Sequence, residues 1–70
     1  MGSDANKEVR SARRALLSAA KTGPVNVRFA GRSRLGPMYQ VINYRDDARF
    51  SLEALRRAAL VSKIRFALEK

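Results

Sequence analysis

The sequence contains no cysteine and no histidine. These absences exclude disulfide bonds, metal sites built from thiolate or imidazole ligands, and nucleophilic catalysis by either residue type. A chain of 70 residues forms one domain at most, and a domain this small buries a limited share of its surface. Because small domains without disulfides or metals are often completed by a partner chain, we expect a homodimer or a bound partner.

Long apolar stretches are missing as well. None approaches the roughly 18 residues of a membrane-spanning helix, and the N-terminus lacks the continuous apolar stretch of a secretory signal. We therefore expect a cytoplasmic protein that does not associate with membranes. Residues 1–3 are expected to be disordered or derived from an expression tag, and residues 4–70 to form a single domain.

Acidic residues are few, since six Asp and Glu stand against fifteen Lys and Arg, for a formal net charge of +9. Eleven of the fifteen are arginine, whose guanidinium group matches the geometry of phosphates and carboxylates. No nucleophile can be paired with a base along the chain, so we expect a non-enzyme without catalytic residues, cofactor or metal. The expected partner is nucleic acid, with DNA favoured, or an acidic protein surface.

The first helical pattern runs from about residue 4 to residue 21. Apolar side chains recur on one face at spacings of three and four, and Gly23-Pro24 follows as a stop signal. The opposite face is basic and consists of Lys7, Arg10, Arg14 and Lys21, with Arg13 at its margin. Because no acidic residue interrupts these positions, the pattern predicts a phosphate-binding stripe rather than a face that only confers solubility.

Two strands are predicted at residues 24–30 and 37–44, joined by a Gly- and Pro-containing turn. Arg32 and Arg34 lie at the tip of this hairpin, and Arg28 is expected on the same ribbon surface. Two-stranded ribbons fit the DNA major groove, so these arginines join the candidate binding residues. The second strand is apolar on both faces, which predicts either a central place in a sheet or cover by a partner. Because two strands alone are marginal, pairing across a dimer is expected.

The last helix is predicted from Leu52 to about residue 69, with Ser51 as its N-cap and Phe50 packing in front of it. A polar turn at residues 45–49 precedes it, and its arginines are expected to be solvated or paired with the neighbouring aspartates. The helix has two apolar faces, so we expect one of them to pack against the same helix of a second chain. This predicted dimer interface consists of Leu60, Ile64 and Leu68. Alternatively, the first helix covers that face within one chain.

Together these patterns predict an α+β domain of order helix–strand–strand–helix (αββα), with a two-stranded antiparallel hairpin and a dimeric state. The predicted function is that of a small DNA-binding regulatory protein that acts mainly through phosphate contacts. The alternative is a small inhibitor or adaptor, of the kind that mobile elements encode, that covers an acidic or nucleic-acid-binding surface of a host protein complex. The same arginines would then meet carboxylates.

Overall fold

The chain folds into two helices and a four-stranded sheet, as seen in a computed structural model that describes residues 3–69. The elements are α1 (Ser3–Ala20), β1 (Val25–Ser33), β2 (Gly36–Val41), β3 (Phe50–Ser51), α2 (Leu52–Ser62) and β4 (Phe66–Leu68). The predicted α+β class is confirmed, but the order αββα lacks two strands, β3 and β4. Residues 1 and 2 lie outside the described residues, whereas Ser3 already belongs to α1.

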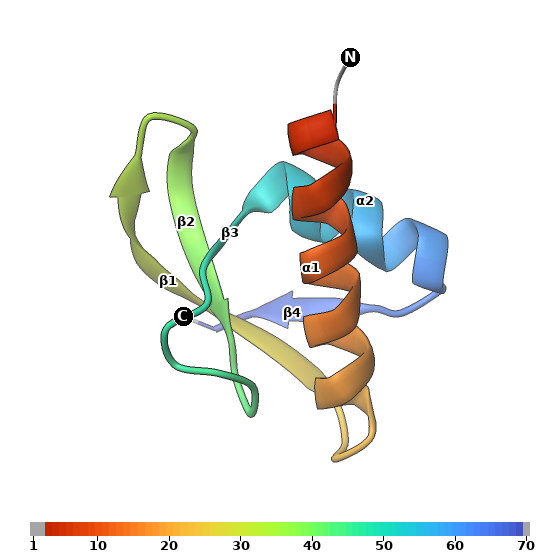
Figure 1. Ribbon diagram of the computed structural model, residues 1–70. Coiled ribbons are helices and arrows are strands. Elements are labelled where there is room, and N and C mark those ends of the chain that lie inside the picture. The colour runs from red at the N-terminus through yellow and green to blue at the C-terminus, as the bar shows by residue number, and fades with distance from the viewer. Residues whose placement is uncertain (1–2, 70) are drawn as a thin grey trace.

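Both helices pack on one face of the sheet and form a two-layer domain (Figure 1). The buried side chains of the helices are mostly alanine, which lets α1 and α2 approach closely. The core consists of Ala12, Ala15, Leu16 and Ala19 from α1, Val25, Val27, Val41 and Phe50 from the sheet, and Ala54, Leu55 and Ala58 from α2. Across residues 3–69, neither helix is long and apolar enough to cross a membrane.

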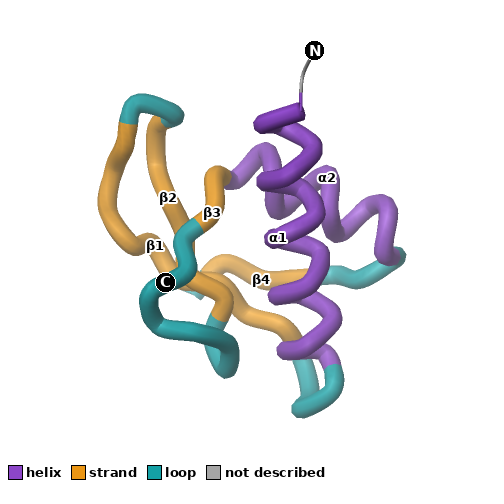
Figure 2. Tube along the Cα trace, in the orientation of Figure 1, coloured by secondary structure: helices purple, strands orange, loops and turns teal. Residues whose placement is uncertain are grey.

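The sheet has the strand order β3-β2-β1-β4, traced in Figure 2. β1 and β2 form the predicted antiparallel hairpin, with Val27 opposite Val41, and β3 pairs antiparallel with β2. β4 runs parallel to β1, with Val25 opposite Phe66. β2 is therefore a central strand, which explains its two apolar faces. Because one chain supplies all four strands, the expectation that a dimer must complete the sheet loses its basis.

The predicted last helix is too long, because α2 ends at Ser62. Lys63 adopts a left-handed conformation (φ 57°, ψ 38°), and its N–H points back to the carbonyls of Ala59 and Leu60. The N–H of Ile64 donates to the Ala59 carbonyl at 3.0 Å, which completes a Schellman motif. At the other end of α2 the prediction is confirmed, since the Ser51 hydroxyl accepts a hydrogen bond from the Ala54 N–H.

The segment beyond α2 becomes a strand because β1 offers it an unpaired edge. Ile64, Phe66 and Leu68 alternate with less apolar residues, as in a strand. The backbone N–H of Glu69 donates to the Val27 carbonyl at 2.8 Å, which extends the pairing. Leu60, Ile64 and Leu68 thus lie on α2, on the connection and on β4 respectively. They do not form one helix face, so the predicted helical arrangement of these residues is wrong, and their part in a dimer interface stays a prediction.

Candidate nucleic-acid interface

The exposed side of α1 carries a row of cations that we call the basic stripe. It consists of Lys7, Arg10, Arg13 and Arg14 on the helix and of Lys21 directly after its last residue, all of them exposed. None of the five forms an ion pair with any side chain that the structure describes. Ala12, Leu16 and Ala19 on the opposite side of the helix are buried in the core, so the stripe points away from the sheet. At 1.5 Å per residue it extends over about 21 Å.

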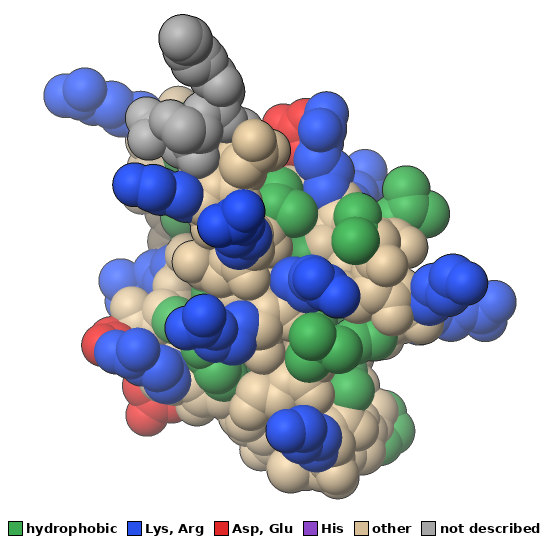
Figure 3. Space-filling view, turned by 45° about the vertical axis from the view of Figure 1, so that its right-hand side comes forward, with side chains coloured by type: hydrophobic (Ala, Val, Ile, Leu, Met, Phe, Trp, Pro, Cys, Tyr) green, Lys and Arg blue, Asp and Glu red, His purple; other side chains and the backbone are tan. Residues whose placement is uncertain are grey.

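The surface of the stripe is hollowed between its arginines. A shallow depression of about 430 Å³ is lined by Arg10, Arg13, Arg14, Leu17, Ser18 and Lys21. Leu17 is 42% exposed and provides the apolar floor of this depression. Figure 3 shows many Lys and Arg side chains and few acidic ones on this side of the molecule. The stripe is therefore a set of donors with room for an anionic group between them.

The hairpin tip is a second basic surface, separate from the stripe. Arg32 and Arg34 are exposed there, and the tip stands away from α1 in Figure 1. Gly31 and Gly36 have φ values of 100° and 95°, a conformation that strains residues with a side chain. The pairing register shifts between Phe29 and Arg32, which marks a bulge just before the turn. The two glycines and the bulge fix the shape of this tip.

Arg28 lies apart from the basic stripe. Its neighbour Val27 is buried beneath the helices, so Arg28 projects from the opposite face of the sheet. There its Nε donates to Glu69 Oε1 at 2.9 Å. Arg28 is thus on the far side of the domain from the basic stripe, and a carboxylate partly compensates its charge. That Arg28 shares the ribbon surface of Arg32 and Arg34 stays a prediction.

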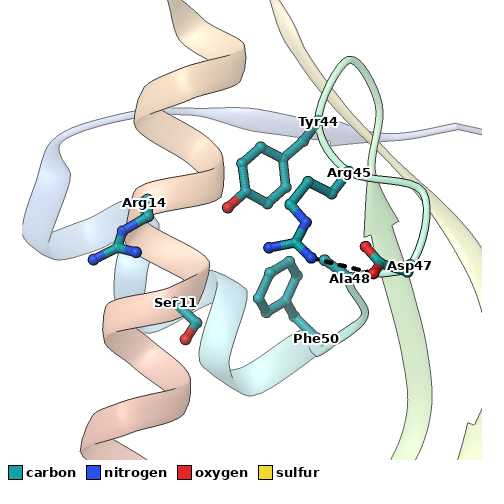
Figure 4. Close-up of a pocket in the computed structure, with 7 residues that line it drawn as sticks. All are labelled: Ser11, Arg14, Tyr44, Arg45, Asp47, Ala48 and Phe50. Atoms are coloured by element: carbon teal, nitrogen blue, oxygen red, sulfur yellow. Dashed lines mark hydrogen bonds and ion pairs between the residues drawn. The ribbon is translucent and has the colours of Figure 1, made fainter.

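A small pocket lies between α1 and the loop that precedes β3. It measures about 230 Å³ and is lined by Ser11, Arg14, Tyr44, Arg45, Asp47, Ala48 and Phe50. In Figure 4 the Tyr44 hydroxyl points toward α1, while the Arg45 guanidinium group lies near the Phe50 ring. Arg45 Nη2 donates to Asp47 Oδ2 at 3.2 Å, as the sequence predicted for this turn. The pocket is smaller than usual ligand sites, which measure roughly 300–1,000 Å³, and Asp47 lowers its positive charge.

Sequence reasoning missed a further surface, which we call the α2 groove. It measures about 650 Å³ and is lined by Arg56, Ala59, Leu60, Lys63, Ile64, Arg65 and Phe66. The groove exists because the chain reverses at Lys63, so its two walls come from α2 and from the segment leading into β4. The alternation of apolar residues after Lys63 is the sequence signal that could have revealed it.

No protein-family model matches this chain, and no curated protein or solved structure matches it. Its function is therefore argued from its own residues. Two surfaces combine exposure with a distinct chemistry, namely the basic stripe and the α2 groove.

Proposed function

We propose that the protein binds DNA through phosphate contacts made by the basic stripe. The supporting observation is that five exposed cations lie on one side of α1 with no ion-pair partner among the described side chains. B-DNA carries one negative charge per roughly 1.7 Å of its axis. A stripe of about 21 Å can therefore lie against several phosphates at once.

The shape of α1 suits this role. An α-helix with its side chains is about 10–12 Å wide, close to the ~12 Å width of the major groove. Lysine and arginine are donors without acceptor capacity, whereas reading all four base pairs requires donors and acceptors. We therefore expect phosphate contacts to dominate, with little sequence specificity. Arg32 and Arg34 provide a second, smaller contact at the hairpin tip, and Arg28 has no part in the proposal.

The salt dependence of DNA binding tests this proposal. Fluorescence anisotropy of a labelled duplex, measured from about 50 to 200 mM salt, gives the slope of log K against log salt, about −0.9 for each neutralised phosphate. Five contacts predict a slope of about −4.5, and the double variant Arg10→Ala/Arg14→Ala should be shallower by about 1.8. Alanine is the best helix former, so these changes should leave α1 intact.

The matched control is Arg56→Ala/Arg57→Ala, which removes the same charge from the surface of α2. We expect its slope to equal that of the parent protein. If both double variants lose affinity and slope to the same extent, net charge rather than the stripe governs binding, and the proposal fails. Absence of binding at about 50 mM salt would contradict DNA binding altogether.

The alternative function, a small inhibitor or adaptor that binds a protein, finds support in the α2 groove rather than in the stripe. Homodimerisation stays a prediction. The pairing of strands, which was one reason to expect a dimer, occurs within one chain, whereas the small size of the domain still favours a partner. Light scattering at high protein concentration measures homodimerisation directly.

A further inference from the structure

The α2 groove exposes apolar side chains that the domain itself does not cover. Leu60 is 81% exposed, and its neighbour Val61 is 63% exposed. Leu68 on β4 is 48% exposed. Of these three, Leu60 lines the groove, together with the apolar Ala59, Ile64 and Phe66. An apolar cluster that stays open to solvent is typical of an interaction surface, whereas single exposed leucines are ordinary.

The floor of the groove is held by the fold. The left-handed Lys63 ends α2 and redirects the chain, and residues of the following segment line the groove together with residues of α2. Ile64 and Phe66 are partly buried and pack against the core. Ala59, which also lines the groove and packs against the core, has a small side chain that fills little of this space. The groove is thus a shallow, open depression whose apolar base belongs to the packed part of the domain.

The rim of the groove is positively charged. Arg56, Lys63 and Arg65 line it, and none of them pairs with a side chain that the structure describes. The two nearest acidic residues along the chain have other partners: Glu53 lies 3.8 Å from Arg57, and Glu69 pairs with Arg28. Among the side chains that the structure describes, no acidic one lines the groove. Any occupant therefore meets three uncompensated positive charges around an apolar floor.

We infer that the α2 groove binds a segment of a partner protein that carries both acidic and large apolar side chains. The acidic groups pair with the rim, and the apolar ones cover Leu60, Ile64 and Phe66. Charge selects this occupant over a second copy of the chain, which would bring a net charge of +9 and three more cations to the same place. The phosphates of DNA could pair with the cations of the rim, but DNA offers no apolar surface to cover the floor of the groove.

A peptide-binding measurement tests this inference. The probe is a short fluorescein-labelled peptide of alternating glutamate and leucine, titrated with the full chain. We expect it to bind at least about tenfold more tightly than a glutamate–serine peptide of equal charge or a lysine–leucine peptide of equal apolarity. If the glutamate–serine peptide binds as tightly, the apolar floor has no role and the inference fails.

Two variants locate the site. Leu60→Ser removes an exposed apolar anchor without touching the core and should weaken binding by about tenfold or more, because burying a leucine accounts for that much. Arg65→Glu should weaken it similarly. The matched controls lie at the hairpin tip, where Leu35 is 66% exposed. Leu35→Ser and Arg34→Glu should bind the peptide as the parent does, and circular dichroism should show all four variants folded.

Three results would overturn the inference. Groove variants that bind like the parent would show that the peptide binds elsewhere, and tip variants that weaken binding equally would show that it follows overall charge. A dimer in sedimentation velocity that Leu60→Ser dissociates would assign the groove to a second copy. Peptide binding can be tested independently of DNA binding, because we expect the variant Arg10→Ala/Arg14→Ala to bind the peptide as the parent does.

Discussion

Glu8 of α1 completes the N-terminal cap of α2, and its removal should destabilise the domain. Glu8 Oε1 accepts hydrogen bonds from the Ser51 hydroxyl at 2.9 Å and from the Ser51 N–H at 3.2 Å. The same hydroxyl accepts from the Ala54 N–H. The carboxylate therefore lies at the positive end of the α2 dipole, where a negative charge is favourable. Glu8→Ala removes this link between the two helices.

The size of the effect follows from these contacts. A hydrogen bond to a charged group contributes about 1.5–3 kcal/mol, and partial exposure of Glu8 and Ser51 places this pair toward the lower end. We expect Glu8→Ala to lower the free energy of unfolding by about 2 kcal/mol, a large share of the roughly 3–10 kcal/mol typical of a domain this size. The melting temperature should fall by about 8–16 °C. Ser51→Ala should cost a similar amount, and the double variant about 1 kcal/mol less than the sum.

Urea unfolding followed by circular dichroism measures these changes. The control is Glu53→Ala, which also removes an acidic residue near the start of α2. The Glu53 side chain is 80% exposed, and its Oε1 lies 3.8 Å from Arg57 Nε. Glu53→Ala should therefore lower the free energy of unfolding by no more than about 0.5 kcal/mol. An equal cost for Glu8→Ala and Glu53→Ala, or strict additivity with Ser51→Ala, would refute the capping role.

Two further changes test the fold. Lys63→Gly should raise the free energy of unfolding by up to about 1 kcal/mol in urea titrations, because glycine adopts the left-handed conformation at φ 57° without strain; a loss of stability would contradict the assigned helix end. Leu16→Ala should lower it by about 2–5 kcal/mol, because Leu16 is fully buried, and thermal unfolding should show the drop; a cost below about 1 kcal/mol would place Leu16 outside the core.

The parts of the fold that local patterns encode were predictable. The buried face and basic stripe of α1 follow from helical spacing, and the hairpin follows from the strand alternation around Gly31 and Gly36. The N-cap of α2 follows from Ser51. Each of these features depends on residues close in sequence, which is why the predicted α1 cations lie together in the structure.

The end of α2 and the strand β4 were not predictable in the same way. Leu60, Ile64 and Leu68 recur every four residues, as in a helix, while Ile64, Phe66 and Leu68 recur every two, as in a strand. The choice depends on the free edge of β1, which is distant in sequence, and on a left-handed lysine where glycine is usual. The α2 groove depends on this same chain reversal, so it escaped sequence reasoning too.

The parallel pairing of β4 with β1 also shapes how the domain folds and opens. Val25 and Phe66, which pair, are 41 positions apart (66 − 25), so a long loop must close before they meet, whereas the β1–β2 hairpin closes locally. β4 should therefore dock late and exchange its amide hydrogens sooner than the hairpin. Transient release of β4 would dismantle the floor of the groove while α1 and the hairpin stay folded. A partner bound in the groove would in turn slow that opening, which links occupancy of the groove to the order of the sheet edge.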